Sequence, residues 1–200
     1  MNKNWRLCLT VLSGAILISH SAYAESKALR DLKIHIASVQ QVLTDPKLAE
    51  REHRDERRRI ALTLMHQVFD FREMARRSLG ANARRYSDRV EEFTPIFVHL
   101  LEQTYLSKLE EHGDAKIEYT KEAVNGDFAE IQTKTRVKDG TEYSIIYKLQ
   151  LGPSGWRVYD VIGEGVSVVN NYRAQFDRFL SKKSFDELLQ ALREKKSSVS

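Results

Sequence analysis

Two carboxylates, Asp160 and Glu164, flank a glycine-containing turn late in the chain. A pair of acids can act as general acid and general base when their surroundings separate the two pKa values. The plainer role for an aspartate at the end of a strand is to satisfy a backbone N–H or an arginine, and we favour that role for Asp160. The sequence shows no serine-hydrolase elbow, phosphate-binding loop, zinc-protease motif or dinucleotide fingerprint. We therefore expect no enzyme and name no catalytic residue.

The histidines beyond the N-terminal segment are scattered. They are His35, His53, His66, His99 and His112. None is spaced with another histidine or with a carboxylate in a recognisable ligand pattern. We expect them at helix surfaces and helix boundaries, and we expect no metal and no cofactor.

The first 24 residues resemble a secretory signal. Lys3 and Arg6 precede an apolar run over residues 7–19, which is too short to span a bilayer comfortably, and Ala22-Tyr23-Ala24 has the small-x-small form of a cleavage site. We expect cleavage after Ala24, which leaves a mature domain of residues 25–200; an uncut N-terminal anchor is the alternative. Cys8, the single cysteine, would be removed with the signal. The mature chain would then lack disulfides and thiolate chemistry.

Charge argues against nucleic acid as a partner. Removal of the signal takes away two bases and no acid, so the formal net charge falls from +4 to +2. Bases and acids are mixed along the chain, and no basic patch interleaved with aromatic residues stands out. The densest charged run, REHRDERRR at residues 51–59, reads either as a partner-binding patch or as a solvated helix with compensating pairs. We favour the solvated helix.

The elements that would position these residues follow from hydrophobic periodicity. Apolar spacings of three and four predict helices over residues 26–43, 49–69, 71–79, 88–112, 170–180 and 185–195. Asp70 with Glu73, and Ser184 with Glu187, have the form of helix-starting capping boxes. A period of two predicts strands over residues 117–124, 129–137, 143–151 and 156–162, separated by turn signals such as Asn125-Gly126 and Asp139-Gly140.

This order of elements predicts an α+β domain. We expect an antiparallel meander of four to five strands, covered on one face by about six helices. In the segment GWRVYDVIGEGVSVVNNYRAQF, residues 155–176, a strand passes through Gly163 and Gly165 into an aromatic helix. Composition alone favours an ordinary packed core behind this corner and does not indicate a ligand.

The same segment carries a family resemblance. Together with DFREMARRSLG at residues 70–80 and LLEQTYLSKL at residues 100–109, it resembles the MlaC family of periplasmic phospholipid-carrying proteins of the Mla system, also described as toluene-tolerance or ABC-transporter auxiliary proteins. The resemblance covers nearly the whole mature chain in the right order. The charged run at residues 51–59 is not part of it.

The resemblance implies a periplasmic carrier that acts without a cofactor. Such a protein would hold a glycerophospholipid by its acyl chains in an apolar cavity between sheet and helices, with the headgroup toward solvent. It would shuttle the lipid, as a monomer, between an outer-membrane lipoprotein–porin complex and an inner-membrane ABC transporter complex, and so maintain outer-membrane lipid asymmetry. Two alternatives remain open: a periplasmic ABC-transporter adaptor with a filled core, and an enzyme on a cone-like α+β scaffold.

The resemblance also suggests which side chains would line the cavity. The expected lipid-binding residues are Phe71, Met74, Phe97, Leu101 and Tyr105 from the helices, Tyr147, Leu149, Val158 and Val161 from the sheet, and Val166, Val169, Tyr172 and Phe176 at the corner. Val158 and Val161 would point to opposite faces of a flat strand, so only one of them would line the cavity. Arg173 and Lys148 could lie at its mouth, although a solvated position is the plainer interpretation.

Overall fold

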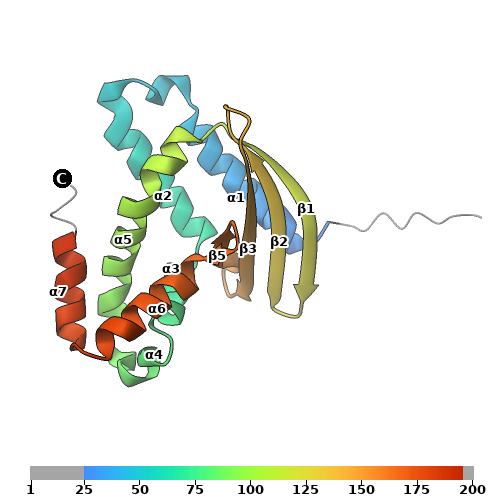
Figure 1. Cartoon of the computed structure of the whole chain (residues 1–200). Helices are drawn as coiled ribbons and strands as arrows, with labels where there is room; N and C mark the ends of the chain where they lie inside the picture. Colours follow the sequence, from blue (N-terminus) through green and yellow to red (C-terminus); the bar gives the residue numbers. More distant parts are fainter. Residues whose placement is uncertain (1–24, 196–200) are drawn as a thin grey trace, which may run out of the picture.

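The sheet of the computed structural model, which describes residues 25–195, is an antiparallel meander of five strands in the order β1-β2-β3-β4-β5 (Figure 1). The strands are β1 (Lys116–Asn125), β2 (Phe128–Arg136), β3 (Glu142–Gly152), β4 (Gly155–Gly163) and β5 (Val166–Ser167). The first two predicted hairpin turns contain Gly126 and Gly140, at φ 55° and 89°, where a residue without a Cβ is favoured. The predicted α+β class and meander are confirmed, whereas the expected signal, residues 1–24, lies outside the described residues.

Helices precede and follow the sheet, as the periodicity predicts. They are α1 (Lys27–Leu43), α2 (Arg54–Val68), α3 (Phe71–Leu79), α4 (Asn82–Arg85), α5 (Val90–Glu111), α6 (Val168–Leu180) and α7 (Phe185–Lys195). The predicted cap at Asp70 forms, because its Oδ1 accepts a hydrogen bond from the Glu73 N–H at 2.9 Å. Pro95 is the sixth residue of α5, where its missing N–H leaves the Glu91 carbonyl without its hydrogen bond from the next turn.

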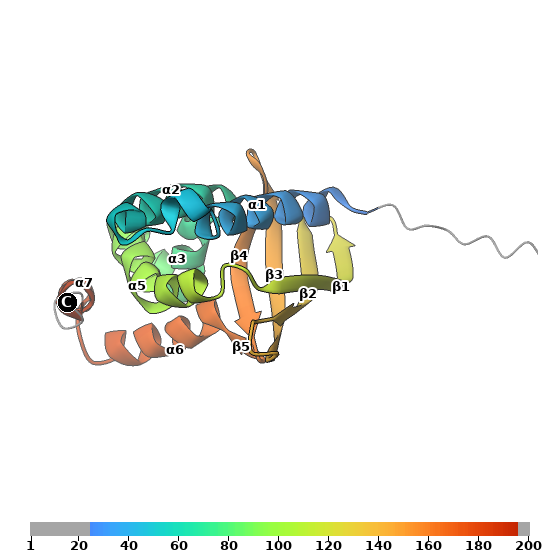
Figure 2. The ribbon, with the colours of Figure 1, turned by 90° about the horizontal axis from the view of Figure 1, so that it is seen from above.

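The helices meet the sheet in two ways. α1 runs across one face of the strands, while α2, α3, α5, α6 and α7 gather on the β4 side of the sheet (Figures 1 and 2). The edge of β4 is covered by the end of α2, since Phe69 bridges to Val158 and the Asp70 N–H donates to the Val158 carbonyl at 2.8 Å. This contact removes a free sheet edge and fixes the helices against β4.

Two hydrophobic cores result from this arrangement. The sheet core packs α1 residues such as Leu32 against Ile131, Leu149 and Val158. The helical core is built by α3, α5, α6 and α7; its fully buried members include Leu79, Phe93 and Phe97. Phe69 packs against both cores. The join between α2 and β4 is therefore also the join between the two cores.

The charged run enters α2 and pairs across the molecule. Arg58 donates Nε to Glu110 Oε1 at 2.8 Å and Nη2 to Oε2 at 2.7 Å, and Arg54 and Arg57 lie within 3.9 Å of the same carboxylate. The Glu110 side chain is 9% exposed. The run is thus less solvated than expected: part of it ties the start of α2 to the end of α5.

Candidate functional site

A cavity of about 390 Å³ lies where the two cores meet, on the β4 side of the sheet. This volume falls in the range of about 300–1,000 Å³ that small-molecule sites occupy. Its walls are mainly aliphatic and aromatic. The lining residues are Leu62, Met65, Phe69, Phe71, Met74, Leu101, Glu102, Tyr105, Leu106, Leu109, Ile145, Tyr147, Val161, Gly163, Val166, Val168 and Asn171.

The helical walls arise from spacing along α2, α3 and α5. On α5, Leu101, Tyr105 and Leu109 are four residues apart and therefore lie on one face. On α3, Phe71 and Met74 are three residues apart and point the same way. These stripes leave an apolar surface that the neighbouring strands do not fill.

The sheet wall depends on a β-bulge in β4. Tyr147 pairs with Val161, and Leu149 pairs with Val158. Tyr147 and Leu149 are two positions apart on β3, whereas Val158 and Val161 are three positions apart on β4. The extra residue places both Val158 and Val161 on the same face, because a bulge shifts the alternation of side chains by one. The expectation that the two side chains point to opposite faces is therefore wrong, although Val161 lines the cavity and Val158 packs in the sheet core.

The cavity interior favours uncharged groups. Burial raises the pKa of the Tyr147 hydroxyl far above its usual value, and the neighbouring Tyr119 raises it further. Burial likewise raises the pKa of Tyr105, with a smaller contribution from Tyr172. Both phenols therefore remain neutral at any physiological pH. Glu102 is the charged residue of this wall, and its Oε2 lies 3.5 Å from Nδ1 of His99.

The cavity reaches the surface beside the end of α5 and the short strand β5. Among its lining residues, Leu109 is 37% exposed and Val166 is 59% exposed, unusual values for large apolar side chains. Glu164 and Gly165, both at positive φ, turn the chain into β5 and so present Val166 at this opening. The opening thus has an apolar rim.

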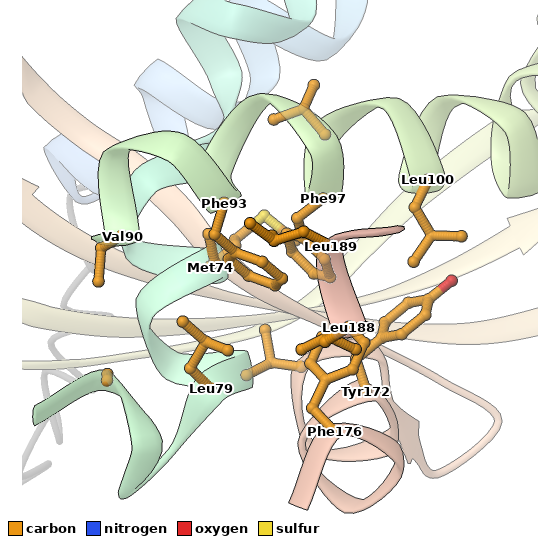
Figure 3. Close-up of a cluster of buried hydrophobic side chains, with 14 of the residues drawn as sticks. Met74, Leu79, Val90, Phe93, Phe97, Leu100, Tyr172, Phe176, Leu188 and Leu189 are labelled. Carbon is orange, nitrogen blue, oxygen red and sulfur yellow. The ribbon is translucent and has the colours of Figure 1, made fainter. Parts of the chain in front are cut away.

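Seven of the expected residues line the cavity, and six lie elsewhere. The seven are Phe71, Met74, Leu101, Tyr105, Tyr147, Val161 and Val166. Phe97, Val169, Tyr172 and Phe176 instead pack in the helical core. The rings of Phe97, Tyr172 and Phe176 contact one another there, edge-on and stacked (Figure 3). Leu149 and Val158 lie in the sheet core beneath α1. These six side chains are buried by their neighbours, and each is 6% exposed or less.

Several lining residues were not anticipated. Leu109 continues the α5 stripe four residues after Tyr105, a signal that the sequence does contain. Leu106 also lines the cavity, but it is not three or four residues from Leu101 or Tyr105. Leu62 and Met65 lie on the helix that begins as the charged run, where the charge obscures the apolar face. Ile145 and Gly163 pair with each other across β3 and β4 at the end of the sheet wall.

Asp160 and Glu164 have separate hydrogen-bond partners. Asp160 is 5% exposed; its Oδ2 accepts from the Ser167 hydroxyl at 2.7 Å and its Oδ1 from the Val169 N–H at 3.1 Å. Glu164 accepts from the Ser144 N–H at 2.6 Å. Asp160 therefore holds the start of α6 against β4, as the plainer interpretation predicted. Arg173 does not reach the cavity mouth either, since its Nε donates to the Arg77 carbonyl at 2.9 Å.

One exposed group of potential metal ligands lies far from this chemistry. Glu50, Glu52 and His53 bring their ligand atoms within 4.8 Å of one another on the surface before α2. All three are exposed, and such acidic groups commonly occur without an ion.

Within residues 25–195, no helix combines the length and apolar character needed to cross a bilayer.

An α+β fold whose sheet and helices enclose a mainly apolar cavity with an apolar rim defines the class of proteins suited to hold an apolar ligand. Comparison with known proteins identifies the family. Residues 35–194 match the family described as MlaC protein, so the chain belongs to the MlaC family. The predicted family membership is confirmed.

One curated protein and one solved structure are similar to the chain over most of its length. It is 25% identical over 212 aligned residues to the "intermembrane phospholipid transport system binding protein MlaC" of Haemophilus influenzae, an alignment that covers 98% of this chain and 94% of the relative. Its fold is similar to that of a phospholipid-binding protein from Ralstonia solanacearum solved in complex with a phospholipid, with a TM-score of 0.74 and 21% identity, covering 87% of this chain and 99% of the other.

Proposed function

We propose that the protein is a periplasmic carrier that holds a glycerophospholipid by its acyl chains in the cavity between the two cores. The observation that carries the proposal is the apolar lining of a cavity in a chain of the MlaC family. The Haemophilus relative is named for phospholipid transport, and the Ralstonia protein was solved with a phospholipid. The alternative adaptor role would leave an unfilled apolar cavity without a purpose.

The energetics suit a carrier. Burial of an acyl chain contributes about 0.8 kcal/mol per CH₂ group, so two ordinary chains supply on the order of 20 kcal/mol before costs. This approaches the practical ceiling of noncovalent affinity. Spontaneous release into water would accordingly be slow, and delivery would require a partner that opens the cavity or lowers its affinity.

The same proposal covers export and partners. We infer that residues 1–24 are removed on export and that residues 25–200 act as one monomeric domain in the periplasm. The lipid would pass between an outer-membrane lipoprotein–porin complex and an inner-membrane ABC transporter complex of the Mla system. This traffic would maintain the lipid asymmetry of the outer membrane.

The proposal is tested by the contents of the purified protein. Protein isolated without detergent is extracted with organic solvent, and the extract is quantified by mass spectrometry. We expect near-stoichiometric phospholipid, and uptake of added phospholipid by delipidated protein. If the purified protein carries no phospholipid and takes none up from vesicles, the carrier role is wrong.

A further inference from the structure

A second cavity of about 550 Å³ lies beside the first and has a different chemical character. It is formed by the end of α2, the start of α3, one face of α5 and a single side chain of β4. Its lining mixes cationic, polar and apolar groups. The lining residues are His66, Phe69, Asp70, Phe71, Arg72, Thr94, Pro95, Val98, His99, Glu102 and Arg157.

The two cavities are neighbours along α5. The polar cavity uses α5 residues 94–102 and the apolar cavity uses residues 101–109, and Glu102 borders both. Phe69 and Phe71, stacked with ring centroids 5.5 Å apart, also border both. At a rise of 1.5 Å per residue, the span from residue 94 to residue 109 along α5 is about 22 Å. The two cavities therefore adjoin along α5 as an apolar end and a polar end, with two aromatic rings between them.

Arg157 is the residue of the polar end whose hydrogen bonding is incomplete. Its Nε is buried and donates to no atom among the described residues. A buried donor without an acceptor costs free energy, so native structures usually supply a partner. The guanidinium also has the planar fork that matches the oxygens of a phosphate.

The other charged groups of the polar end are balanced. Arg72 is the second cation of the lining, and Asp70 and Glu102 are its acids. Asp70 accepts from the Glu73 N–H, and Glu102 lies 3.5 Å from His99. Arg72 pairs with Glu91 at 2.6 Å in an exposed contact that an incoming anion can displace.

We propose that the polar cavity is an anion subsite, centred on Arg157, that binds the phosphate of the lipid whose acyl chains occupy the apolar cavity. This inference rests on the proposed carrier function and adds headgroup recognition to it. Acyl burial alone does not distinguish a phospholipid from a neutral diacylglycerol with the same chains. A phosphate on Arg157 supplies that distinction, because a hydrogen bond to a charged group contributes more than one between neutral groups.

The test compares two lipids that differ only in the headgroup. Delipidated protein is loaded from vesicles that contain dioleoylphosphatidylglycerol and dioleoylglycerol in equal amounts, and the bound ratio is measured by mass spectrometry. We expect Arg157→Gln to lower the bound ratio of phospholipid to diacylglycerol about tenfold while total loading persists. Arg157→Lys should lower the ratio less. The matched control is Arg136→Gln, which removes an exposed arginine of β2 that pairs with Glu142 of β3. This variant should leave the ratio unchanged.

Each outcome decides between the possibilities. An unchanged ratio in Arg157→Gln overturns the subsite but leaves the carrier role intact. Failure of the unaltered protein to load either lipid overturns both. Calorimetric titration with inorganic phosphate distinguishes a lipid headgroup from free phosphate as the ligand. If Arg157→Gln abolishes phosphate binding but leaves the lipid ratio unchanged, the cavity is a site for free phosphate. If Arg157→Gln melts early, Arg72→Gln replaces it, since Arg72 is exposed and its loss should still lower the ratio several-fold.

Discussion

Arg58 of α2 and Glu110 of α5 form a two-point ion pair, with N–O distances of 2.8 and 2.7 Å, across the two helices that flank the apolar cavity. This hydrogen bonding, opposed by burial and aided by the charges of Arg58, Arg54 and Arg57, holds the pKa of Glu110 below its ordinary value of 4.5. A folded-state pKa below the unfolded value means stability that is fully present above pH 4.5 and lost as the pH falls through the folded value.

The first prediction concerns this pair. Glu110→Gln should lower the free energy of unfolding by about 1–3 kcal/mol at pH 7, because three arginines lose their shared carboxylate. The gap between wild type and variant should shrink as the pH falls below 4.5, measured by urea unfolding at several pH values. Glu142→Gln, in an exposed pair with Arg136, should leave the stability essentially unchanged. A stability difference between wild type and variant that stays constant with pH would show that the carboxylate charge does not stabilise the contact between α2 and α5.

The second prediction fills the cavity. Gly163 lines it, pairs with Ile145, and has open space where a Cβ would lie. Gly163→Leu should therefore reduce uptake of phospholipid several-fold while the melting temperature changes little, as measured by loading from vesicles and by thermal unfolding. Gly152→Leu, at the far end of β3 and also nearly free of close contacts, is the control and should load normally. Equal loading by both variants would place the acyl chains elsewhere.

The third prediction separates core from cavity on one helix. Phe97 is fully buried in the helical core, whereas Leu106 borders the cavity. Phe97→Ala should lower the free energy of unfolding by about 3–5 kcal/mol, because it leaves a new void among packed rings. Leu106→Ala should cost clearly less, because its side chain already faces a void, and should change lipid loading more than Phe97→Ala does. The reverse order, in denaturant unfolding and vesicle loading, would contradict this division.

The fourth prediction concerns the two carboxylates near β5. Asp160→Asn should lower the free energy of unfolding by about 1–3 kcal/mol, since an amide cannot accept from both Ser167 and Val169 through two oxygens. Glu164→Gln keeps an acceptor for the exposed Ser144 N–H and should have little effect. Thermal unfolding of both variants measures the difference. Unchanged stability in Asp160→Asn would reopen a chemical role for this carboxylate.

The elements themselves could be predicted because their signals are local. The cap of α3 at Asp70 and the hairpin turn at Gly126 depend on residues that are neighbours in sequence. The strand order β1-β2-β3-β4 then follows, since consecutive hairpins leave little choice of topology. The α+β class could therefore be predicted from the sequence.

The division of side chains between core and cavity could not be predicted in the same way. Phe97 and Leu101 are four residues apart on one helix and both turn inward, yet Phe97 meets α6 while Leu101 meets the void. That difference depends on how far α6 lies from α2, which no local spacing reports. The sheet wall posed a similar difficulty, because the bulge between Val158 and Val161 leaves no signature in the residue types.

Phe69 packs against both hydrophobic cores, and it also lines the cavity. A void inside one core can change size only if tightly packed side chains rearrange, which is costly. A void at the boundary between two cores can widen when the two bodies tilt slightly about their contact, with each interior left as it was. In the proposed carrier, adjustment to acyl chains of different length would therefore cost least at this boundary between the two cores.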